Sequence, residues 1–62
     1  MASLTSKELT ALEDQLAMEQ NIISKYKMYS QTAVDSEIKD KCNCIASKHQ
    51  KHYDTLISQL QG

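Results

Sequence analysis

The chain has 62 residues, of which 40% are hydrophobic and 24% are charged, and its formal net charge is -1. This length allows one small domain, and the composition is typical of a folded protein, which excludes a disordered chain. All seven cationic side chains are Lys. Because there is no Arg and no basic run, the sequence argues against nucleic-acid binding.

The sequence also argues against a membrane protein. No apolar run approaches the roughly 20 residues that a bilayer span needs. The N-terminus lacks the basic and apolar regions of a signal peptide, so we expect an intracellular protein. Pro is absent and the single Gly is Gly62. Nothing in the interior of the chain therefore breaks a helix.

The first predicted element is a helix over residues 6–32, which begins at a capping box. Thr5 and Glu8 are spaced so that each side chain can bond the backbone amide of the other. Apolar residues then recur in steps of three and four, which is a helical period of about 3.5 residues. The positions of this series are Leu9, Leu12, Leu16, Glu19, Ile23, Tyr26, Ser30 and Ala33, of which Glu19 and Ser30 are polar.

The second predicted element is a helix over residues 36–60. Asp35 is the expected N-cap, and Glu37 places a negative charge in the first turn. The positions with helical spacing are Ile38, Cys42, Ile45, His49, His52 and Leu56. A break of two or three residues around Val34 makes the two helices antiparallel. The sequence thus predicts an all-α fold, a single helical-hairpin domain over residues 1–62.

One contact between two helices covers little of either apolar stripe. Ile22, Tyr29, Tyr53 and Ile57 widen the stripes, and we predict that they form an oligomer interface. Domains of this size commonly need a metal, disulfides or oligomerisation for stability. We therefore predict a homo-oligomer, in which two hairpins related by a two-fold axis form a four-helix bundle. Tyr26 and Tyr29 are interpreted as packing residues.

Glu19 occupies a central position of the first stripe, where a carboxylate is costly unless it is paired or bound to a metal. Counting outward from the turn brings Glu19 level with His49 and within one helical turn of His52. Three interpretations follow. Glu19 and His49 form a hydrogen bond that fixes the register of the helices; or Glu19, His49 and His52 bind Zn or Fe; or Glu19 reaches solvent.

Cys42 and Cys44 are two residues apart, so on a helix their side chains point about 200° apart. They can neither share a metal ion nor form a disulfide with each other. We predict that Cys42 lies between the helices and that Cys44 faces outward, where it is free to form an intermolecular disulfide. No Ser–His–Asp or Cys–His arrangement survives the helical geometry, so we do not expect an enzyme.

The order and spacing of these features resemble small ferritin-like proteins, above all the coat F-type spore coat proteins of spore-forming Firmicutes. The resemblance is carried by residues 9–19 and 25–29 in the first helix and by residues 35–41 and 49–56 in the second. It implies a ferritin-like bundle, a structural role in sporulation, and a place in the spore coat with other coat proteins as partners. It implies no demonstrated reaction.

The chain departs from the ferritin-like metal pattern at one position. Ferritin-like di-metal sites use Glu-x-x-His motifs, in which a Glu precedes the His by three residues. The residue three before His49 is Ala46. The resemblance therefore implies, as an alternative function, a metal-binding protein with a degenerate site formed by Glu19 and His49 across the bundle.

Overall fold

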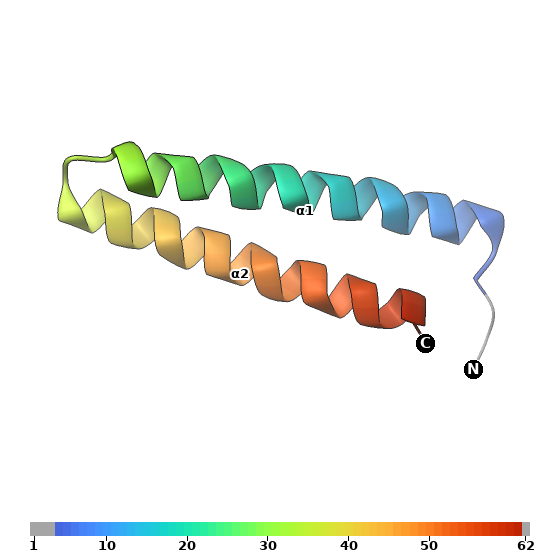
Figure 1. Ribbon diagram of the computed structural model, residues 1–62. Helices are drawn as coiled ribbons and strands as arrows, with labels where there is room; N and C mark the ends of the chain where they lie inside the picture. The colour runs from blue at the N-terminus through green and yellow to red at the C-terminus, as the bar shows by residue number, and fades with distance from the viewer. Residues whose placement is uncertain (1–3, 62) are drawn as a thin grey trace.

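The structure, a computed structural model, describes residues 4–61. Two helices, α1 (Ser6–Thr32) and α2 (Ser36–Gln61), run antiparallel side by side and are joined by residues 33–35 (Figure 1). Helices are the only regular elements over these residues, which confirms the predicted all-α hairpin. The predicted bounds of α1 are correct, and α2 ends one residue later than predicted. Residues 1–3 and 62 of the predicted domain lie outside the described part.

The predicted capping box is present at the start of α1. The Thr5 hydroxyl accepts a hydrogen bond of 3.1 Å from the Glu8 amide, and the Glu8 carboxylate accepts one of 3.0 Å from the Thr5 amide. These bonds satisfy amides that have no partner within the helix. The bond with the Thr5 backbone, and then the bond with its hydroxyl, lower the pKa of Glu8.

The reversal between the helices needs no glycine. Ala33 has an extended backbone (φ -67°, ψ 134°), and its amide donates to the Tyr29 carbonyl at 2.9 Å. Asp35 caps α2 as predicted, because its Oδ1 accepts hydrogen bonds of 2.8 Å from Glu37 and 3.3 Å from Ile38. Ala33 thus keeps a conformation that an ordinary side chain allows.

The core between the helices is thin. The buried apolar residues are Ile23, Cys42 and Ala46, and no side chain of the described residues is completely buried. The hairpin measures 47 × 17 × 11 Å, so each helix has a neighbour on one side only. Leu9 and Ile38, which belong to the predicted stripes, therefore remain exposed.

The hairpin has two broad faces, one on each side of the contact between the helices. Helical residues seven apart lie along one stripe, so the faces can be defined by heptad steps. The His52 face comprises Gln15, Ile22 and Tyr29 of α1 with Ile38, Ile45 and His52 of α2, and the same steps add Glu8 and Gln59 at the end away from the turn. The Tyr53 face comprises Gln20 and Lys27 of α1 with Asn43, Gln50 and Ile57 of α2, together with Tyr53, which lines the same groove as Gln20 and Gln50. Apart from Glu8 and Gln59, the first face is mainly apolar, whereas the second is mainly polar.

Grooves along the hairpin agree with this division. One groove is lined by residues of the Tyr53 face, including Gln20, Gln50 and Tyr53. Another groove is lined by Gln15 and His52 of the His52 face, together with Glu19, Thr55 and Leu56. The two sets share no residue, as expected for opposite sides of a two-helix layer.

The four predicted interface residues divide between these faces. Ile22 and Tyr29 lie on the His52 face, whereas Tyr53 and Ile57 lie on the Tyr53 face. The Tyr53 hydroxyl accepts a hydrogen bond of 3.3 Å from Gln20. A single face-to-face contact with another hairpin would therefore contain two of the four residues.

The two tyrosines of the C-terminal half of α1 pack against each other. The rings of Tyr26 and Tyr29 lie 5.5 Å apart at 89°, the edge-to-face arrangement that aromatic quadrupoles favour. Tyr26 is half-buried, and Tyr29 is 46% exposed. Tyr29 thus extends the apolar surface away from the core.

Over residues 4–61, neither helix contains a stretch that is long and apolar enough to cross a membrane.

Candidate functional site around Glu19

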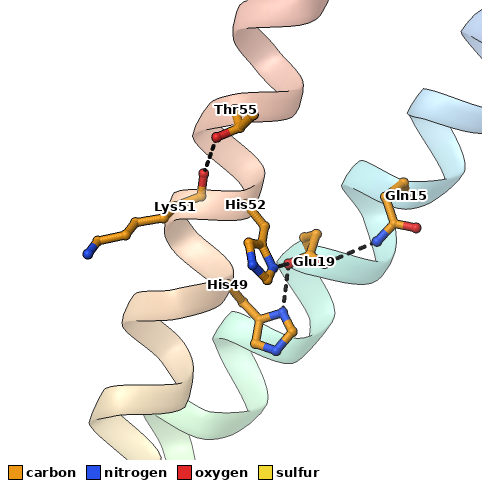
Figure 2. A network of polar contacts seen from close by, with 6 residues as sticks. All are labelled: Gln15, Glu19, His49, Lys51, His52 and Thr55. Atoms are coloured by element: carbon orange, nitrogen blue, oxygen red, sulfur yellow. Dashed lines mark hydrogen bonds and ion pairs between the residues drawn. The ribbon is translucent and has the colours of Figure 1, made fainter.

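The two helices bring Glu19, His49 and His52 together halfway along the hairpin (Figure 2). Oε2 of Glu19 lies 2.7 Å from Nδ1 of His49 and 3.7 Å from Nδ1 of His52. The imidazole rings lie 5.2 Å apart at 82°. Because His49 and His52 are three residues apart on α2, both reach the same carboxylate from one side. The predicted Glu19–His49 pairing is confirmed.

The exposure of these side chains changes steadily from the core to the rim. Glu19 is 5% exposed, His49 is 26% exposed and His52 is 61% exposed. The interpretation in which Glu19 reaches solvent is therefore wrong. His52 lies at the edge of the cluster, and through its side chain the cluster is exposed to solvent on the His52 face.

A fourth residue, Gln15, completes the surroundings of Glu19. Its Nε2 donates a hydrogen bond of 3.0 Å to Oε1 of Glu19, so each carboxylate oxygen has a partner. Over residues 4–61, no buried side-chain oxygen or nitrogen lacks one. Gln15 was not among the site residues predicted from the sequence. Its spacing of four residues from Glu19 on a helix is the signal that would have identified it.

The protonation of Glu19 follows from these contacts. The hydrogen bond with His49 is the largest cause, and it lowers the pKa of Glu19 below its ordinary value of 4.5. Burial of the carboxyl group acts in the opposite direction but is outweighed, because the charge of His49 and the bond from Gln15 also lower the pKa. Glu19 is therefore a carboxylate at neutral pH.

Acid should weaken the hairpin through Glu19. A group whose pKa is lower in the folded state stabilises the fold fully above its unfolded pKa, here about 4.5. That contribution disappears as the pH falls through the folded-state pKa. We therefore expect the parent to lose more stability than Glu19→Gln between pH 5 and pH 3, measured by urea unfolding in the presence of a chelator.

The capping residue Glu8 provides an internal control for this comparison. The pKa of Glu8 is also lowered, so protonation of Glu8 in acid destabilises the fold as well. This loss is the same in the parent and in Glu19→Gln. Its effect cancels in the difference between the parent and Glu19→Gln. Identical pH profiles for the two proteins would contradict the prediction.

The cluster has the composition and spacing of a metal site. Three ligand atoms, one each from Glu19, His49 and His52, lie within 4.8 Å of one another. Tetrahedral Zn²⁺ with bonds near 2.0–2.1 Å separates its ligand atoms by roughly 3.3 Å. The distances of 2.7 and 3.7 Å lie on either side of this value. Glu19, His49 and His52 could therefore hold a zinc ion with one further position open, once the Glu19–His49 hydrogen bond widens to the spacing of metal ligands.

The cysteines lie outside this cluster. Cys42 is buried and Cys44 is exposed, as predicted, and both are free thiols. Their different exposure agrees with side chains that point in different directions from α2. The nitrogen and oxygen ligands of the cluster suit Zn²⁺ or Fe²⁺ without any thiolate.

No protein-family model, curated protein or solved structure matches this chain. The resemblance to coat F-type proteins thus stays a prediction from the sequence. What the fold and the cluster define is an all-α helical hairpin with a Glu–His–His group at its centre.

Proposed function

We propose that this chain is a non-enzymatic structural protein, which assembles when two hairpins pair through their His52 faces into a four-helix bundle. The observation that carries the proposal is the imbalance between apolar surface and core. Three apolar residues are buried, whereas Tyr29 and Ile38 on the His52 face are 46% and 54% exposed. Small domains with such surfaces are commonly completed by oligomerisation.

A second copy of the chain is the partner that suits this face. A two-fold interface uses the same surface on both subunits, so the surface must complement itself. Between Gln15 and Tyr29 of α1, and between Ile38 and His52 of α2, the heptad positions of the His52 face contain no Lys, Asp or Glu. Pairing two such faces brings no like charges together over this central part. Helix pairs with a period of 3.5 residues pack in this way in four-helix bundles.

The spore coat is the setting that we propose for this assembly, with other coat proteins as further partners. The support is the order and spacing of residues 9–19 and 49–56, which resemble coat F-type proteins. The test is to fractionate spores of the source organism and to locate the chain by mass spectrometry. Its absence from the coat fraction would contradict this setting.

The pairing predicts a concentration-dependent dimer. We expect a mass of twice the 7.0 kDa chain in solution, and a melting temperature that falls on dilution. Ile22→Asp places a charge in the centre of the His52 face, and it should shift the protein to a monomer. Light scattering after gel filtration, over a hundredfold range of concentration, measures both effects.

Ala17→Asp is the matched control for this variant. Ala17 is exposed on the outer side of α1, five residues before Ile22, and the substitution adds the same charge. It should leave the mass unchanged. A monomeric parent with a melting temperature independent of concentration would refute the pairing, as would equal dissociation of both variants.

Metal binding is the second candidate function, and a specific observation favours it. The ligand atoms of Glu19, His49 and His52 lie within 4.8 Å of one another, in a hairpin that otherwise buries only one further polar residue, Ser30, among those described. Gln15 holds the second oxygen of the carboxylate, as supporting residues do in metal sites.

A further inference from the structure

The Glu–His–His cluster lies at the centre of the hairpin along its length. Glu19 has thirteen residues of α1 on either side, and His49 has thirteen residues of α2 before it and twelve after it. His52, which is 61% exposed, opens the cluster onto the His52 face. The cluster therefore sits in the middle of the surface through which we propose that two copies pair.

Any two-fold pairing of stacked hairpins brings their two central clusters level with each other. A two-fold axis that exchanges two stacked hairpins lies in the plane between them. If the axis runs along the helices, every residue stays level with its own copy. If the axis runs across the helices, full overlap places it at mid-length, and only central residues meet their copies. In both arrangements the two clusters come level with each other.

The charges of the cluster decide how many ions such a centre holds. Two paired hairpins contribute two Glu19 carboxylates, whose charge equals that of one divalent cation. A second divalent ion would leave an excess of two positive charges in a partly buried site, which is unfavourable. The carboxylate that would bridge two ions is also missing, because Ala46 occupies its position.

We propose that two copies of this chain bind one divalent transition-metal ion between them, with ligands drawn in equal numbers from the two Glu19–His49–His52 clusters. The proposal rests on the proposed pairing through the His52 face. Zn²⁺ is the ion that suits the imidazole and carboxylate ligands. Each hairpin supplies the same ligand atoms from its own cluster, and the ion lies between the two hairpins on the two-fold axis.

The arrangement makes metal binding and dimerisation mutually dependent. Packed helices lie 8–10 Å apart, so side chains at the rim of one hairpin reach the other. Zn²⁺ should therefore strengthen the dimer, and by linkage the dimer should bind Zn²⁺ more tightly than the monomer does. We expect the dimer dissociation constant to fall at least tenfold when Zn²⁺ is saturating.

The experiment measures stoichiometry and affinity on the same untagged proteins. All variants carry Cys44→Ser, since this exposed thiol could bind Zn²⁺ or link two chains. Native mass spectrometry with ZnCl₂ counts ions per dimer, and sedimentation with ZnCl₂ or a chelator gives the dimer dissociation constant. We expect one Zn²⁺ for every two chains.

Three variants give the proposal its controls. His52→Ala should lose the strengthening by Zn²⁺, whereas Lys51→Ala should keep it, because the Lys51 side chain points away from the cluster (Figure 2). Ile22→Asp, as a monomer with the cluster residues intact, should not retain Zn²⁺ through buffer exchange.

The outcomes separate this inference from the pairing on which it rests. If the parent dimerises but binds one Zn²⁺ per chain, with the same affinity as Ile22→Asp, the metal belongs to a single hairpin and the inference is wrong while the pairing stands. If the parent dimerises and Zn²⁺ leaves its dissociation constant unchanged, the inference is equally wrong. A parent that is monomeric with and without Zn²⁺ refutes both.

Discussion

His49→Leu should lower the melting temperature of the metal-free protein by on the order of 10 °C, because it removes the main partner of a buried carboxylate. Glu19 is 5% exposed, and its Oε2 lies 2.7 Å from His49. Leucine at position 49 leaves that oxygen facing an apolar side chain. The neighbouring His52 lies at 3.7 Å and cannot replace so short a bond without moving.

The double variant Glu19→Leu with His49→Leu should restore the melting temperature of the parent or exceed it. Replacing a buried ionic pair by apolar residues of similar volume is often neutral or stabilising, whereas removing one partner is not. The two single variants and the double variant form a thermodynamic cycle, measured by thermal unfolding with a chelator present. A double variant that is no more stable than His49→Leu would show that the pair is not a coupled unit.

Zn²⁺ should stabilise the parent by about 2.7 kcal/mol when its free concentration is one hundred times its dissociation constant. Glu19→Gln keeps the shape of the side chain but replaces the carboxylate with a neutral amide, and it should lose this response. The measurement is urea unfolding at several concentrations of ZnCl₂, followed by reversal with a chelator. Fe²⁺ in the absence of oxygen is the second probe.

Glu13→Gln is the matched control for the metal response. Glu13 is an exposed carboxylate of the same helix and lies outside the cluster. The substitution is chemically identical, so this variant should respond to Zn²⁺ as the parent does. Stabilisation that persists in Glu19→Gln, or that disappears equally in both variants, would contradict metal binding by the cluster.

The local features of this fold were predictable because each depends on residues close together in the chain. The capping box requires only Thr5 and Glu8. The turn requires only Asp35 as a cap and the short break before it. It was also predictable that Glu19 and His49 lie opposite each other, since two continuous helices joined by a short turn leave little freedom in their register.

The division of the apolar residues between two faces was not predictable in the same way. Ile22 and Tyr53 both widen a stripe, and a helical wheel of one helix does not show which flanks of two helices come together. The structure places Ile22 on the His52 face and Tyr53 on the other, where Gln20 bonds its hydroxyl. The side of the bundle on which each flank lies depends on how the helices are rotated about their axes.

The amino-acid sequence by itself determined the two helices, their antiparallel order and the presence of a Glu and a His at one level, because helical period, capping and turn length are local properties. The tertiary structure alone decided that Glu19 is buried, that Gln15 holds its second oxygen and that His52 stands at an open rim. These properties depend on the distance between the helices and on their rotation, which arise only when the helices pack against each other and bury Ile23, Cys42 and Ala46.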